Sequence, residues 1–183
     1  MTTASDLLGE GVTWARAEHP HAAHLERTLF WARELEPRAS GVLQLAALLH
    51  DIERALPDPG SPFDSARDWS LDAYVDYHQG RSAAHLARWM AERGAEADEI
   101  SPAVALVAVH ERGGWPEADL LQAADSLSFI ETLTPLLREW IATGRSSQAN
   151  ALAKLDFMWD RIRVPVAHER GRALYETARA EVA

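Results

Sequence analysis

Apolar residues recur at intervals of three and four along most of the chain, whereas the alternating pattern of half-buried strands is missing. Prolines, glycines and capping residues separate these segments. The pattern predicts helices over residues 4–19, 21–35, 41–55, 68–93, 101–110, 116–143, 146–163 and 165–182. A break is expected near Gln79–Gly80 and a kink at Pro135. The sequence therefore predicts an all-α fold.

The segment from Gly41 to Ala55 is apolar on nearly every side, which predicts a central buried helix. A loop containing Pro57, Pro59, Gly60 and Pro62 follows it. This loop is long enough to cover a site formed at the end of the buried helix.

Length and composition narrow the function classes. A chain of 183 residues corresponds to one domain, since domains typically hold ~100–200 residues. Its formal net charge of −10 disfavours binding to nucleic-acid polymers, because the phosphate backbone would be repelled. The chain has no cysteine but 8 histidines. Any metal site must therefore use nitrogen and oxygen ligands.

One dipeptide, His50–Asp51, lies at the end of the most apolar segment. Burying an imidazole and a carboxylate there is costly unless each has a partner, and a divalent cation would satisfy both. A local hydrogen bond at a helix end is the alternative. His24 lies 26 residues before His50 on another predicted helix, and Asp125 lies in a second small, apolar helical stretch.

These residues, together with the run Ala-Leu-Leu-His-Asp-Ile and the later Ala-Asp-Ser-Leu, resemble the HD-domain superfamily of metal-dependent phosphohydrolases. The signature of that family is a His, a His-Asp pair after an apolar run, and a later Asp. The resemblance covers about residues 21–131. It implies a single helical-bundle domain over 1–183, with helices over 146–182 packed on the motif core, and a metal site that activates water. His21 is the competitor to His24 for the first position.

Two further histidines extend this resemblance. Some HD families carry two extra histidines that complete a dinuclear site, and His78 and His110 stand in the matching order. The turn after His110 is also similar to that of the bacterial HD hydrolases of symmetrical diadenosine tetraphosphate. As alternatives, His78 is a surface residue of its helix, and His110 is a helix C-terminal residue favoured by the helix dipole.

The resemblance implies a ligand set of six residues for one or two divalent ions, with iron, manganese, cobalt and zinc not distinguishable. In the dinuclear interpretation, Asp51 bridges the ions and also takes part in catalysis. One ion would be held by His24, His50 and Asp125, and the other by His78 and His110.

Three arginines are candidate ligands for substrate phosphate. Arg27 and Arg81 each follow a candidate histidine by three residues, and Arg54 stands where many HD families have lysine, in His-Asp-Ile-Gly-Lys. Arg81 is preferred for neutralising charge in the transition state. As an alternative, all three are surface arginines paired with neighbouring carboxylates.

The leading hypothesis is hydrolysis of a small phosphorylated metabolite, above all a nucleotide. The first alternative is an HD-type dinuclear iron oxygenase, which shares the ligand order. The second is a non-catalytic nucleotide-sensing HD module. The longest apolar runs are too short to span a bilayer, and residues 1–10 lack the features of a signal peptide, so a cytoplasmic protein without membrane partners is expected. A homodimer is a possible assembly.

Overall fold

The computed structural model describes residues 2–58 and 60–183, so Pro59 of the predicted loop lies outside the described residues. Within these ranges the chain has an isolated bridge between Thr2 and Ala95 but no strand. The predicted all-α fold is confirmed. The described helices are α1 (Ala4–Glu18), α2 (Ala22–Leu35), α3 (Gly41–Leu49), the 3-10 helix η1 (Ile52–Ala55), α4 (Asp72–Ala91), α5 (Ala97–Val107), α6 (Pro116–Thr132), α7 (Thr134–Ala142), α8 (Gln148–Asp160) and α9 (Pro165–Val182).

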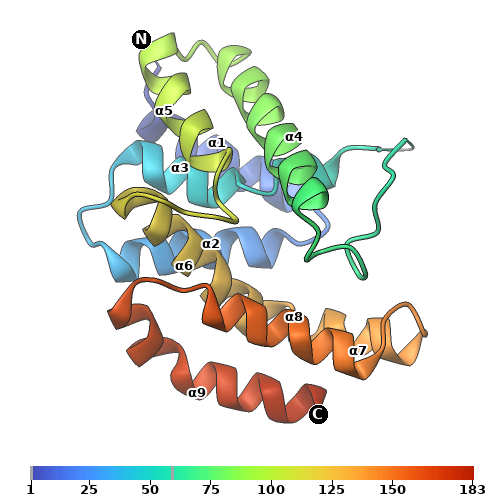
Figure 1. Ribbon diagram of the computed structural model, residues 1–183. Coiled ribbons are helices and arrows are strands. Elements are labelled where there is room, and N and C mark those ends of the chain that lie inside the picture. The colour runs from blue at the N-terminus through green and yellow to red at the C-terminus, as the bar shows by residue number, and fades with distance from the viewer. Residues whose placement is uncertain (1, 59) are drawn as a thin grey trace.

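Helix α2 lies in the middle of the bundle and packs against both α3 and α6 (Figure 1). Helices α1 and α5 pack against α3, and α4 packs against α5. On the other side of the bundle, α8 and α9 pack against α6 and against each other (Figure 1). The arrangement places the ends of several helices around the C-terminus of α3.

Helix α3 is the buried helix that the apolar pattern predicts. The Ser40 hydroxyl caps its first turn by accepting a hydrogen bond from the Leu43 amide at 3.1 Å. The prediction that this helix continues to Ala55 is wrong, because α3 ends at Leu49. The chain changes direction at His50–Asp51 and continues as the short helix η1. The two candidate ligands therefore stand at a junction between two helices rather than inside one.

Other predicted helix boundaries and breaks also differ from the structure. The segment 116–143 forms two helices, since Leu133 separates α6 from α7. Pro135 is in the first turn of α7, where its missing N–H costs no helical hydrogen bond. Helix α4 runs through Gly80 without a break. Helix α5 begins at Ala97 rather than at Ser101, because the acidic Asp98 and Glu99 favour a first turn there.

Helix α9 packs closely against α6 at Gly171. A Cβ atom at this position would collide with the Leu127 side chain and lie 3.2 Å from the ring of Trp159. Only glycine therefore permits this approach without a shift of the neighbouring side chains. Among the described helices, none has both the length and the apolar character needed to cross a membrane.

Candidate metal centre

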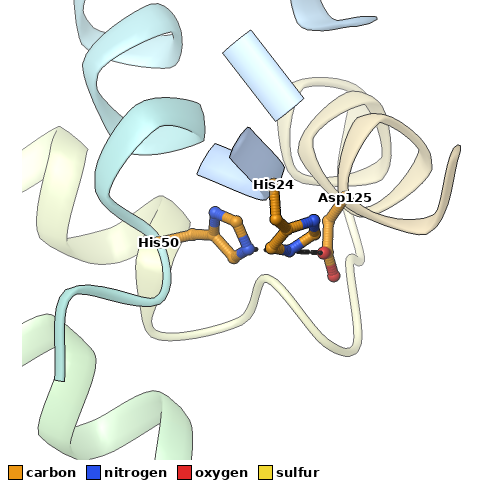
Figure 2. A group of neighbouring side chains, drawn as sticks. All are labelled: His24, His50 and Asp125. Atoms are coloured by element: carbon orange, nitrogen blue, oxygen red, sulfur yellow. Dashed lines mark ion pairs between the residues drawn. The ribbon is translucent and has the colours of Figure 1, made fainter. Parts of the chain in front are cut away.

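The six candidate ligands lie in two buried triads. The first contains His24 of α2, His50 at the end of α3, and Asp125 of α6; the second contains Asp51, His78 of α4, and His110 after α5. Within each triad one nitrogen or oxygen atom of every residue lies within 4.8 Å of the others. Figure 2 shows the first triad, with the two imidazoles and the carboxylate pointing toward one another. These are the two groups in which the dinuclear interpretation arranges the residues, and their role as ligands stays a prediction.

In the first triad, one carboxylate oxygen faces two imidazoles. Asp125 Oδ1 lies 3.2 Å from His24 Nε2 and 3.3 Å from His50 Nε2 (Figure 2). His21 is the N-cap residue of α2 and is not part of either triad. Of the two candidates for the first position, His24 is therefore the one that the fold brings to His50.

Asp51 lies between the two triads. Its Oδ1 is 2.9 Å from His78 Nε2, and it is 3.8 Å from the Nε2 atoms of both His50 and His110. The His78 and His110 Nε2 atoms are themselves only 3.2 Å apart. A single carboxylate thus faces imidazoles from both groups, which is the position required of a bridging ligand.

The Nδ1 atoms of the four histidines are anchored by oxygen acceptors. His50 Nδ1 donates to the Ala47 carbonyl at 3.0 Å, and His110 Nδ1 donates to the Val107 carbonyl at 2.7 Å. His78 Nδ1 donates to Glu53 Oε1 at 2.9 Å. Such hydrogen bonds fix the tautomer and leave the Nε2 lone pair for a metal ion.

His24 is anchored in the same way by a serine. Its Nδ1 lies 2.8 Å from the Ser128 hydroxyl, which donates its own proton to the His24 carbonyl at 2.7 Å and therefore accepts from the ring. Four Nε2 lone pairs thus converge on two carboxylates, and His50 Nε2 is buried without a hydrogen-bond partner. Lone pairs this close repel one another unless a cation lies between them, so the donor set fits one or two divalent cations.

The same arrangement shifts the pKa values of the metal-free site. Burial alone would lower the pKa of His50, but Asp51 and Asp125 outweigh it and raise that pKa to about 9. Burial, together with the neighbouring His78 and His50, lowers the pKa of His110 to about 4. Without a cation, the site therefore holds a proton between its carboxylates and imidazoles.

Arg161, the C-cap residue of α8, joins the two halves of the site, and the sequence analysis missed it. Its guanidinium forms short ion pairs with Asp125 and with Glu111, and its Nε donates to the Ser126 hydroxyl at 2.8 Å. Glu111 in turn lies 3.8 Å from His78 Nε2. Although burial disfavours a charged carboxylate, Arg161 and Lys154 lower the pKa of Glu111 to about 2. No sequence signal identified this group of ion pairs, because its residues lie up to 50 positions apart in the chain.

Two of the three predicted substrate arginines are paired close to the second triad. Arg54 Nε donates to Asp51 Oδ2 at 3.2 Å, and its Nη2 donates to the Tyr74 hydroxyl at 2.7 Å. Arg81 Nε lies 3.3 Å from Glu53 Oε2 and 3.4 Å from Asp58 Oδ2. The Glu53–Arg54 pair, which replaces the common Gly-Lys, therefore contacts His78 and Asp51 directly.

The third predicted arginine, Arg27, makes its contacts with residues that belong to neither triad. Its Nε donates to Glu131 Oε2 at 2.5 Å, and its guanidinium stacks over the Phe30 ring at 3.8 Å. The substrate-binding roles of Arg27, Arg54 and Arg81 stay predictions. The structure adds that each already has a carboxylate partner.

A pocket that opens to solvent extends from the triads toward α7 and α8. Its polar end includes Asp51, Asp125 and Arg54. Its other wall is largely apolar and is formed by Phe129, Leu133, Leu136, Trp140 and Met158.

Lys154 of α8 also lines this pocket, and the sequence analysis assigned it no function. Its neighbours on the same helix face, Ala151, Leu155 and Met158, are buried apolar residues. The sequence signal that could have identified Lys154 is a single charged residue on an otherwise apolar helix face. Burial lowers the pKa of the Lys154 ammonium to about 8, while Glu111 acts in the opposite direction.

Comparison with known proteins shows the fold. No family model matches the chain, and no curated protein matches its sequence. The solved structure of Bacillus subtilis YpgQ in complex with ADP is similar over 94% of this chain and 90% of that chain, with 17% sequence identity and a TM-score of 0.60. The all-α fold is therefore that of an HD-domain helical bundle. The similarity to the diadenosine tetraphosphate hydrolases stays a prediction.

Proposed function

We propose that this protein is a metal-dependent phosphohydrolase that acts on a small phosphorylated substrate, above all a nucleotide. The observation that carries the proposal is the convergence of four anchored imidazoles on Asp51 and Asp125, beside a pocket with one largely apolar wall. Divalent cations held there supply Lewis acidity and a water molecule of lowered pKa.

The residues of the chain have distinct tasks in this proposal. Asp51 holds both halves of the centre together, because its Oδ1 faces imidazoles from each triad. Arg161 keeps Asp125 charged and oriented toward His24 and His50. Glu53 fixes the ring of His78 through Nδ1, and Arg81 supports Glu53 from the other side. No nucleophilic side chain is needed, in keeping with the lack of cysteine.

The shape of the pocket supports a substrate with an organic group. A phosphoryl group at the triads would leave the rest of the molecule against the apolar wall that includes Phe129 and Trp140. Aromatic and aliphatic side chains of this kind accommodate a nucleobase or a comparable ring. ADP in the YpgQ structure is a ligand of this chemistry.

The test is phosphate release by the purified protein reconstituted with manganese, cobalt or ferrous iron. Nucleoside mono-, di- and triphosphates and simple phosphomonoesters form the substrate panel. We expect activity that EDTA removes and metal restores, and a loss of at least 10²-fold in Asp51→Ala and in His50→Ala. His85→Ala is the matched control, because His85 is a histidine outside both triads whose ring is bonded to Arg88.

Two outcomes would contradict the proposal. Full activity in Asp51→Ala would exclude the triads as the catalytic centre. Oxygen consumption with a mixed-valent di-iron signal, in place of phosphate release, would favour the oxygenase alternative.

A further inference from the structure

Lys154 is the single lysine of the chain, which has 17 arginines, and it lies in the wall of the pocket beside the two triads. Its residue surface is only 8% exposed. A buried ammonium is costly unless it has a partner, so its surroundings indicate what it is there to bind.

The arginines around the centre already have carboxylate partners. Arg54 pairs with Asp51, Arg81 with Glu53, and Arg161 with Asp125 and Glu111. Lys154 differs. Among the described residues it forms no ion pair within 4.0 Å and no side-chain hydrogen bond, because the nearby carboxylates of Glu111 and Asp125 pair with Arg161 and act on the ammonium only from a longer distance. It is the cation of this pocket that is still available to an anion.

Three aromatic rings surround the ammonium instead. Lys154 Nζ lies 5.3 Å from the ring centres of Trp69 and Phe129 and 5.6 Å from that of Phe157. Ring faces attract a cation electrostatically but accept no conventional hydrogen bond from it. These three rings therefore offset part of the free-energy cost of burying the Lys154 charge, and they leave its N–H donors free.

We propose that the Lys154 ammonium binds a phosphate oxygen of the substrate and positions it in the pocket beside the two triads. This inference rests on the proposed function, because it assigns a residue to the same site. Phosphate suits the position, since a compact ammonium with three free donors binds it as a point charge. Lys154 is a positioning residue: it holds an oxygen of the substrate and takes no proton.

Binding of inorganic phosphate to the manganese-loaded protein, measured by isothermal titration calorimetry, tests this role. Lys154→Met keeps the length and the apolar stem but removes the charge. We expect its Kd for phosphate to rise at least tenfold while its manganese content stays that of the wild type. Lys154→Arg, which keeps the charge, recovers binding relative to Lys154→Met. Arg88→Met removes an exposed cation of α4 and serves as the control, with unchanged Kd.

A structural role for Lys154 predicts a different result. If its charge only balanced the buried carboxylates, Lys154→Met would lose manganese and unfold more easily. That outcome overturns the inference, as does wild-type phosphate affinity in Lys154→Met or an absence of phosphate binding by the wild type.

Kinetics separate the inference from the proposed function. With a phosphomonoester substrate, we expect Lys154→Met to raise KM more than it lowers kcat. If Lys154→Met hydrolyses the substrate with an unchanged KM, the proposed role of Lys154 is contradicted but the proposed hydrolysis is not. Phosphate binding that depends on Lys154 in a protein without any hydrolytic activity would leave this inference standing and contradict the proposed hydrolysis.

Discussion

Replacing Arg161 by methionine removes one partner from a buried charge cluster and leaves the other two in place. The Arg161 side chain is 6% exposed, and its partners Asp125 and Glu111 are 5% and 11% exposed. Breaking a buried ion pair by removing one partner costs about 3–5 kcal/mol, because the remaining charge is uncompensated. For a chain of this length, that corresponds to a decrease in Tm of roughly 10 °C.

The assay is urea unfolding in EDTA and again with saturating manganese. We expect Arg161→Met to lose about 3–5 kcal/mol in EDTA and less with manganese, since a cation at Asp125 replaces part of the missing positive charge. Arg170→Met is the control, because it breaks an exposed ion pair with Glu34 and should cost no more than about 1 kcal/mol. A loss below about 1 kcal/mol for Arg161→Met in EDTA would refute the reasoning.

Three further predictions follow from the packing and the charges. Gly171→Ala should cost about 1–3 kcal/mol of unfolding free energy, because its Cβ would collide with Leu127, whereas Gly9→Ala, with open space around it, should be neutral or stabilising; equal effects would contradict the packing argument. Below pH 8, metal-free wild type should be less stable than Lys154→Met. Between the folded pKa of Lys154, about 8, and its ordinary value of 10.5, the unfolded wild-type chain binds more protons than the folded one. The difference in unfolding free energy between wild type and Lys154→Met should therefore narrow by up to about 3 kcal/mol as the pH rises through this range. Urea unfolding at a series of pH values measures it. Elemental analysis after dialysis should find more metal in Asp125→Ala than in Asp51→Ala, since Asp51 faces both triads; the reverse order would remove Asp51 from the bridging position.

Much of the candidate centre could be predicted from the sequence, because a metal site needs particular residue types and an apolar setting makes them conspicuous. His50–Asp51 after the apolar run, and Asp125 within small apolar residues, are unusual for their surroundings. Helical periodicity likewise identified the all-α fold, since apolar spacing reports which face of each helix is buried.

Local periodicity did not locate the ends of all helices. The turn at His50–Asp51 interrupts a run whose residues all favour burial, so the apolar pattern continues across it. Leu133 separates α6 from α7 without a glycine or proline at that position. Such ends depend on which neighbouring helix the next segment packs against, and that information is not local.

Taken alone, the sequence determined the helical class and the residues able to hold a metal, because both depend on residue type and short-range spacing. Only the tertiary structure decided which partners these residues have. It brought Arg161, at the C-terminus of α8, to Asp125 of α6, paired Arg81 with Glu53, and left Lys154 without an ion pair among the described residues. Pairings of this kind join residues tens of positions apart, and they depend on how helices cross rather than on the spacing within any one of them.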